Sequence, residues 1–150
     1  MGALAVSILA NVLLGAVLLA MLYRKRGEDS ARLTDPAQAL ACYRATSPSA
    51  QGSATLSSDG LGALIDLADG GIGLVERRGR RWNARRLDPL DLAGVDARED
   101  GVVTLRFADF GWPRARVALP DAATRTRWIE RLEGLRREGA AGPHAGMRRA

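Results

Sequence analysis

The sequence predicts a mainly β domain closed by one C-terminal helix and preceded by one N-terminal transmembrane helix. Three observations predict this fold class. Residues 2–23 carry no charge, hydrophobic residues alternate with a period of two from residue 53 onward, and they recur at helical spacing over 121–138. A chain of 150 residues holds about one domain once an anchor is subtracted.

The N-terminal run, residues 1–23, is the predicted membrane anchor. As a helix, residues 2–23 would be roughly 33 Å long, enough to cross a hydrocarbon core of about 30 Å. A cleaved signal peptide would carry positive charge before a shorter apolar run, whereas here Arg24, Lys25 and Arg26 follow the run. The positive-inside rule then predicts a single-pass protein of the inner membrane, with its N-terminus outside and residues 24–150 in the cytoplasm.

Residues 24–52 are predicted to be a linker that contains a short helix. Asp35 is a suitable N-cap, Pro36 suits the first helical position and Gln38 the third. The helix is expected to end before the segment SPSAQG. Cys42 lies in this helix, and we expect a packed or exposed thiol in place of a reactive one, because only Arg44 is near enough in sequence to lower its pKa.

Short strands follow from residue 53. The clearest is 102–108, in which Val103, Leu105 and Phe107 share one face. Turn sequences rich in Gly, Pro and Asp separate the strands. Six or seven strands at roughly ten-residue spacing predict a small antiparallel barrel or sandwich. The same alternation predicts further strands at 62–68, 71–77 and 114–120.

The last element is an amphipathic helix over 121–138 that begins at Asp121 as N-cap. Trp128 and Leu132 lie on its apolar face, and Trp128 is predicted to plug the open end of the barrel because an indole buries a large area.

The domain is thus expected to span residues 53–138, followed by a disordered basic tail over 139–150. The other tryptophans, Trp82 and Trp112, lie near predicted turns. We expect them to be more exposed than Trp128.

The passage RVALPDAATRTRWIERLEGL, a strand that runs directly into a tryptophan-bearing helix, resembles the pleckstrin-homology-like (PH-like) superfamily. The segments GIGLVERRGRRW and LDPLDLAGVDARED are similar to bacterial members, in which a hairpin leads to a turn and a strand that begins with a branched residue, here Val95. Residues 1–138 resemble small, uncharacterised bacterial proteins with one membrane helix and one such domain. The resemblance implies a fold, an anchor and no catalysis, and it implies no ligand.

Composition argues against an enzyme. The chain has a single cysteine, Cys42, and a single histidine, His144, which follows a segment of glycine, alanine and proline. A Ser-His-Asp or Cys-His pair would depend on that histidine, and a zinc site would have too few soft ligands. We therefore predict no catalytic residues, no cofactor, no metal site and no small-molecule substrate.

An arginine-rich hairpin is the strongest candidate for a binding site. A turn through Arg78-Gly79 would gather the basic side chains at one tip, with Arg85 and Arg86 on opposite faces of the next strand. The candidate residues for contact with a lipid or a partner are Arg77, Arg78, Arg80, Arg81 and Arg85.

Three interpretations of this hairpin remain open. Nucleic-acid binding is not expected, because a single tryptophan, Trp82, does not form a stacking platform. The leading interpretation is a solvated hairpin on a non-catalytic interaction module, an accessory or scaffold subunit for another membrane protein. The alternative is peripheral binding of anionic membrane lipid headgroups through the 77–86 arginine hairpin, where each basic residue gains about 1 kcal/mol.

Overall fold

The computed structural model describes Gly15 and residues 32–142. The chain divides into two units, residues 1–32 and 33–150, and all the elements described below belong to the second. The predicted anchor, apart from Gly15, lies outside the described residues. Within the described part of the chain, no helix has the length and apolar character needed to cross a membrane.

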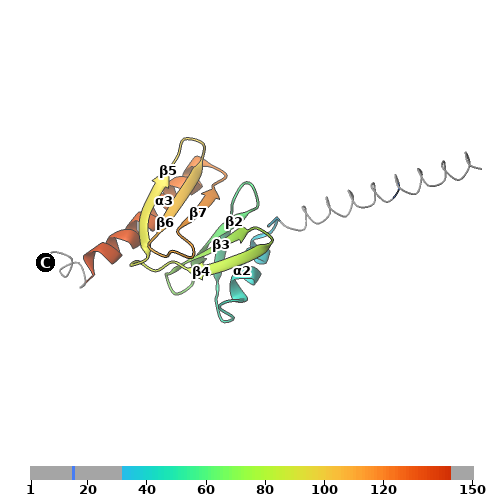
Figure 1. Cartoon of the computed structure of the whole chain (residues 1–150), viewed down its shortest axis with the longest axis horizontal. Coiled ribbons are helices and arrows are strands. Elements are labelled where there is room, and N and C mark those ends of the chain that lie inside the picture. Colours follow the sequence, from blue (N-terminus) through green and yellow to red (C-terminus); the bar gives the residue numbers. More distant parts are fainter. Residues whose placement is uncertain (1–14, 16–31, 143–150) are drawn as a thin grey trace, which may run out of the picture. The chain divides into compact units, whose positions relative to one another are not determined.

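The described part of the second unit, residues 33–142, contains seven antiparallel strands and two helices (Figure 1). Strands β1–β4 form one sheet in sequential order and β5–β7 form another. The prediction of a mainly antiparallel β domain with a C-terminal helix is confirmed. The elements are α2 (Pro36–Arg44), β1 (Gly52–Leu56), β2 (Gly62–Leu67), β3 (Ile72–Arg78), β4 (Arg81–Arg86), β5 (Leu92–Ala97), β6 (Val102–Phe107), β7 (Arg114–Ala118) and α3 (Ala122–Ala141).

Strands β2 and β3 are apolar on both faces, and each face belongs to a different core. Because side chains alternate across a strand, Leu64 and Leu74 face one core while Ile65 and Val75 face the other. The first core lies between the two sheets and α3. It contains Leu64, Ile72, Leu74, Leu87, Leu92, Val103, Leu105, Phe107, Trp112, Ala115, Val117, Leu119, Trp128 and Leu132.

Helix α2 covers the other face of the β1–β4 sheet and forms the second core. Asp35 caps the helix by accepting a hydrogen bond from the Ala37 N–H at 2.8 Å, as the sequence predicts. Ala39 and Tyr43, one turn apart, are buried against the sheet. The Tyr43 ring fits there because residue 73 is glycine, since a Cβ at Gly73 would come within 2.7 Å of the ring.

The compact unit therefore begins earlier than the predicted domain. Leu33 is already buried, and its N–H donates to the Gly60 carbonyl oxygen at 2.8 Å. Residues 33–52, the larger part of the predicted linker, pack on the sheet, and the unit starts at Leu33 instead of residue 53. The alanine-rich helix carries only two buried side chains, so its packing leaves little trace in the hydrophobic pattern.

Helix α3 closes the first core from the opposite side of the β1–β4 sheet to α2 (Figure 1). Trp128 and Leu132 are both fully buried in that core, and the predicted C-terminal helix is confirmed. The ion pair from Arg131 to Asp66, with 2.6 Å between nitrogen and oxygen, fastens the helix to β2. The helix runs on to Ala141, so the predicted tail of 139–150 begins inside it.

Both of the other tryptophans are more exposed than Trp128, as expected, but for Trp112 the difference is small. Trp112 keeps only 8% of its surface exposed and belongs to the first core, while Trp82 is half-buried beside the second. A turn position does not prevent burial here, because the loop before β7 folds back onto the core and carries the indole inward.

Candidate functional site

The arginine hairpin joins β3 to β4 through a two-residue loop, Gly79-Arg80, with Arg78 paired opposite Arg81. Gly79 has φ +63°, as a glycine at the first central position of a type II′ turn requires. The turn therefore lies one residue later than predicted. Within residues 32–142, the exposed side chains of Arg80 and Arg81 make no hydrogen bond or ion pair.

Arg78 joins the hairpin to the loop between β6 and β7. Its Nη1 donates to the Gly111 carbonyl oxygen at 3.1 Å, and its guanidinium lies 5.5 Å from the centre of the Trp112 ring. Arg77 instead donates to the Gly79 carbonyl oxygen at 3.1 Å, within its own hairpin. The tip is thus joined to a second loop that lies far from it in sequence.

Arg85 is a structural residue. Its guanidinium forms ion pairs with Asp91 at 3.1 Å and with Asp109 at 3.3 Å, and it lies 4.5 Å from the centre of the Phe107 ring. Only 15% of its side chain is exposed. Arg86, on the opposite face as predicted, forms an ion pair with Asp69 at 2.7 Å. Of the predicted contact residues, Arg85 is the one whose guanidinium is most engaged in contacts within the fold.

The loop between β6 and β7 presents Phe110 completely to solvent, with a relative exposure of 101%. The loop is fixed by its own contacts: Asp109 accepts the Gly111 N–H at 2.8 Å, and the Phe107 N–H donates to the Pro113 carbonyl oxygen at 2.8 Å. Phe110 is therefore held outward on an ordered loop. Because Arg78 contacts Gly111 and Trp112, the loop that carries this exposed aromatic ring packs against the arginine hairpin. We call Arg78, Arg80, Arg81 and Phe110 the basic–aromatic end.

A second basic surface covers the outer side of the β5–β7 sheet, where a groove of about 390 Å³ runs over the strands. We call its four arginines the arginine face. They are exposed, and Asp96 and Thr104 line the same groove. The sequence pattern does not single out this cluster, although the alternation along residues 114–120 predicts that Arg114 and Arg116 point outward. The arginine face consists of Arg98, Arg106, Arg114 and Arg116.

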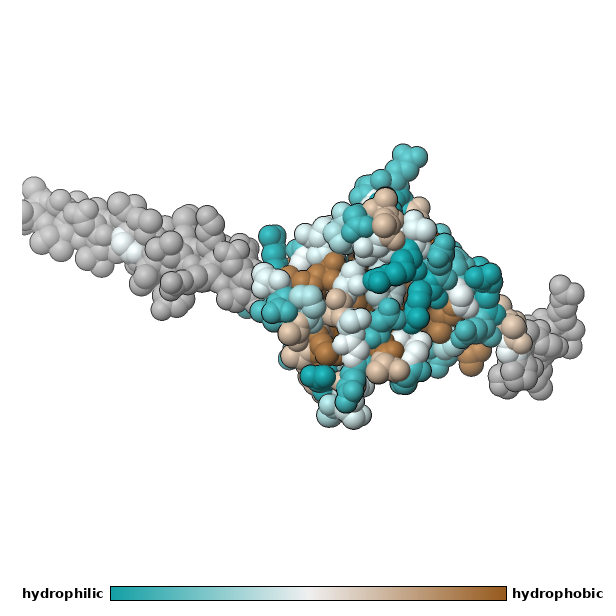
Figure 2. Space-filling model, turned by 180° about the vertical axis from the view of Figure 1, so that it is seen from behind, coloured by the Kyte–Doolittle hydropathy of each residue, from teal (hydrophilic) through white to brown (hydrophobic). Residues whose placement is uncertain are grey.

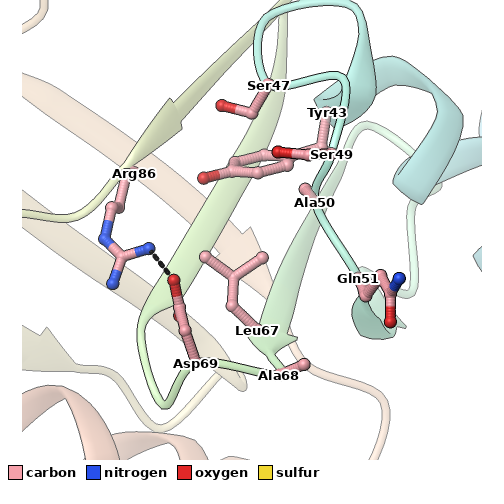
Figure 3. Close-up of a pocket in the computed structure, with 9 residues that line it drawn as sticks. All are labelled: Tyr43, Ser47, Ser49, Ala50, Gln51, Leu67, Ala68, Asp69 and Arg86. Carbon is pink, nitrogen blue, oxygen red and sulfur yellow. Dashed lines mark hydrogen bonds and ion pairs between the residues drawn. The ribbon is translucent and has the colours of Figure 1, made fainter.

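A second hollow, of about 340 Å³, lies between the segment after α2 and the turn joining β2 to β3 (Figure 3). Tyr43, Ser47 and Arg86 line it, and Figure 3 shows the two hydroxyl groups pointing to the side on which Arg86 lies. The hydrogen bond from Arg86 lowers the pKa of Asp69, and the same contact raises the pKa of Arg86. The one arginine of this hollow is therefore neutralised by its neighbour.

The described residues include no group of three or more His, Cys, Asp or Glu side chains placed to hold a metal ion. Cys42 is partly buried, and this burial raises the pKa of its thiol. A raised pKa leaves less thiolate at neutral pH and so lowers the reactivity of the sulfur.

Hydrophilic residues cover much of the visible face in Figure 2, and hydrophobic ones reach the surface there in separate small areas. No protein-family model, curated protein or solved structure matches the chain.

Proposed function

We propose that the chain is a membrane-anchored, non-catalytic PH-like interaction module whose basic–aromatic end contacts the anionic surface of its membrane. Two features support the PH-like assignment: a four-stranded and a three-stranded antiparallel sheet share one core, and a C-terminal helix closes that core with a buried tryptophan, Trp128. The predicted anchor over 1–23 would hold the module at the membrane, with residues 24–150 in the cytoplasm.

The single observation that carries the membrane contact is the full exposure of Phe110 beside the arginine hairpin. An aromatic ring that enters the headgroup region gains about 1.5–3 kcal/mol from burial, and each nearby arginine adds about 1 kcal/mol on an anionic leaflet. Such a total is weak for a free protein. It is enough for a domain that an anchor already keeps at the membrane surface, because the tether removes most of the entropy cost of association with that surface.

Amide hydrogen exchange on the full chain tests this proposal. The chain is reconstituted into nanodiscs of phosphatidylglycerol or of phosphatidylcholine, and exchange is followed at residues 79–81 and 108–112. Slower exchange at both segments on the anionic lipid is expected. It should disappear in Phe110→Ser and in the double variant Arg80→Glu/Arg81→Glu.

The matched control is Arg114→Glu/Arg116→Glu, which reverses two exposed arginines on the other basic surface and should leave the protection in place. Equal exchange on the two lipids in the parent chain would contradict the membrane contact.

A second candidate function is that of an accessory or scaffold subunit for another membrane protein, and the arginine face favours it. Charged surfaces of this kind suit recognition of a complementary protein surface. Affinity purification of the full chain from its native membranes, solubilised in detergent at low salt, with mass spectrometry, tests this role, because detergent disperses the lipid while low salt preserves electrostatic protein contacts. Recovery of one membrane protein in stoichiometric amount is expected.

A further inference from the structure

We infer that the outer face of the β5–β7 sheet binds an extended acidic segment of a partner protein, with the arginine face as the contact surface. This inference rests on the second candidate function, the accessory or scaffold role, and gives its partner a chemistry. It assigns a site distinct from the arginine hairpin.

The strand register places the arginines together. Arg106 on β6 lies directly opposite Arg114 on β7, and Thr104 lies opposite Arg116. Because these residues alternate with the buried Leu105 and with other core residues of the same strands, all four point away from the core.

Part of this positive charge is already compensated. Arg106 forms an ion pair with Asp96 on β5 at 2.8 Å, and its guanidinium passes over Gly94, where a Cβ would come within 2.5 Å of it. In contrast, the side chains of Arg114 and Arg116 make no hydrogen bond or ion pair within residues 32–142. The positive charge of Arg114 and Arg116 is therefore not balanced by any described residue. Like charges directly opposite each other, as at Arg106 and Arg114, also destabilise a sheet.

The spacing of this free charge fits an extended peptide. Arg114 and Arg116 are two residues apart on one strand, so their side chains leave the backbone about 6.5–7 Å apart. An extended segment with acidic residues at alternate positions repeats its carboxylates at the same interval. Each carboxylate could then accept paired hydrogen bonds from one guanidinium, the geometry in which arginine binds carboxylates best.

The composition of the groove favours a protein segment over a lipid surface. Among the described residues, the exposed large hydrophobic side chains are Leu61, Leu90 and Phe110, and none of them lines this groove. A surface that enters a bilayer needs such a side chain, whereas an acidic segment needs only the guanidinium groups and Thr104.

Peptide binding to the full chain in phosphatidylcholine nanodiscs tests the inference. The probe is a fluorescein-labelled peptide in which aspartate and serine alternate four times, followed by fluorescence anisotropy at low salt. The double variant Arg114→Glu/Arg116→Glu should weaken binding by about tenfold or more, as the loss of charge-assisted hydrogen bonds predicts. The control variant Arg80→Glu/Arg81→Glu should bind as the parent does. A peptide with asparagine in place of aspartate should not bind.

Three results would overturn the inference: equal affinity in the parent and the Arg114→Glu/Arg116→Glu variant, loss of binding in the hairpin control, or slowed exchange at residues 104–106 and 114–116 on phosphatidylglycerol nanodiscs. The scaffold role is tested separately from this site. If the membrane protein recovered by affinity purification also copurifies with the Arg114→Glu/Arg116→Glu variant, the scaffold role stands and this site is wrong.

Discussion

The indole N–H of Trp112 donates a hydrogen bond to the carboxylate of Glu76, with 2.9 Å between Nε1 and Oε2. Glu76 lies on β3 and Trp112 in the loop before β7, so one carboxylate joins the two sheets. Its second oxygen accepts the backbone N–H of Arg116 at 3.1 Å. Glu76 thereby supports the loop that presents Phe110 as well as the strand that carries the arginine face.

Glu76→Ala should lower the free energy of unfolding by about 1–3 kcal/mol, because it leaves a mostly buried indole N–H without its acceptor. Glu76→Gln keeps an acceptor and should cost less. Urea denaturation followed by tryptophan fluorescence measures both. Glu99→Ala, at an exposed residue of the loop between β5 and β6, is the control. It should unfold at the same urea concentration as the parent protein.

Trp128→Ala should cost about 3–5 kcal/mol, as other large-to-small changes in a core do, since Trp128 is fully buried. Its indole N–H has no hydrogen-bond partner within the described residues. Trp128→Phe removes that unsatisfied donor and should cost clearly less. Trp82→Ala, at a half-buried site, provides the comparison in the same thermal melts. A melting temperature of Trp128→Ala equal to that of the parent would mean that α3 does not close the core.

Removal of residues 33–52 should destabilise the domain. A fragment of residues 53–142 lacks α2 and exposes the sheet face that Tyr43 and Ala39 cover. Exposed apolar strands promote association. We expect this fragment to melt at a lower temperature and to aggregate at concentrations at which a fragment of residues 33–142 stays monomeric in analytical ultracentrifugation. Equal behaviour of the two fragments would show that α2 is dispensable.

Acid should weaken the domain through two carboxylates. The backbone N–H of Thr124 lowers the pKa of Asp121, and the hydrogen bond from Arg86 lowers that of Asp69. A carboxyl whose pKa is lower in the folded state stabilises the fold above its unfolded pKa, about 3.9, and loses this effect as the pH falls through the folded value.

The pH test compares melting temperatures at pH 7 and pH 3. Asp121→Asn and Asp69→Asn should each melt lower than the parent at pH 7 and approach it at pH 3. A constant difference across this range would assign their effect to something other than ionisation.

Arg114→Glu should raise the melting temperature slightly. It replaces the repulsion between Arg114 and Arg106, which lie opposite each other, with an attractive cross-strand pair of about 0.2–1 kcal/mol. Differential scanning calorimetry measures the change. Arg125→Glu on α3 is the control, because it faces no arginine across a strand pair. A variant that gains stability while it loses acidic-peptide binding would show that this strand is selected for contact.

The alternating strands were predictable because their inward residues are large and their turns contain glycine. The predicted strands 62–68 and 102–108 agree with β2 and β6 to within one residue. The two aromatic residues of the sequence FGWP were not separable by pattern, because the choice between Phe110 and Trp112 for burial depends on Glu76, a residue distant in sequence.

The arginines also illustrate what pattern alone leaves open. The sequence pattern does not distinguish the hairpin residues Arg78, Arg81 and Arg85 from one another. In the structure, however, Arg85 forms ion pairs with two carboxylates from other loops. Arg81 has no such neighbour within the described residues. Pairing across the fold, which local sequence does not encode, decides which basic residues remain available.

The placement of the two helices has a consequence for synthesis on the ribosome. Helix α2 precedes the sheet that it covers. It has therefore already been synthesised when β1–β4 assemble, and it can pack on the sheet at once. Helix α3 comes last, and the first core stays open until Trp128 and Leu132 leave the ribosome. At about 5–20 residues per second, that interval lasts some seconds after β3 is made. During it the nascent domain has one finished side and one apolar side, which is when a chaperone would be expected to bind it.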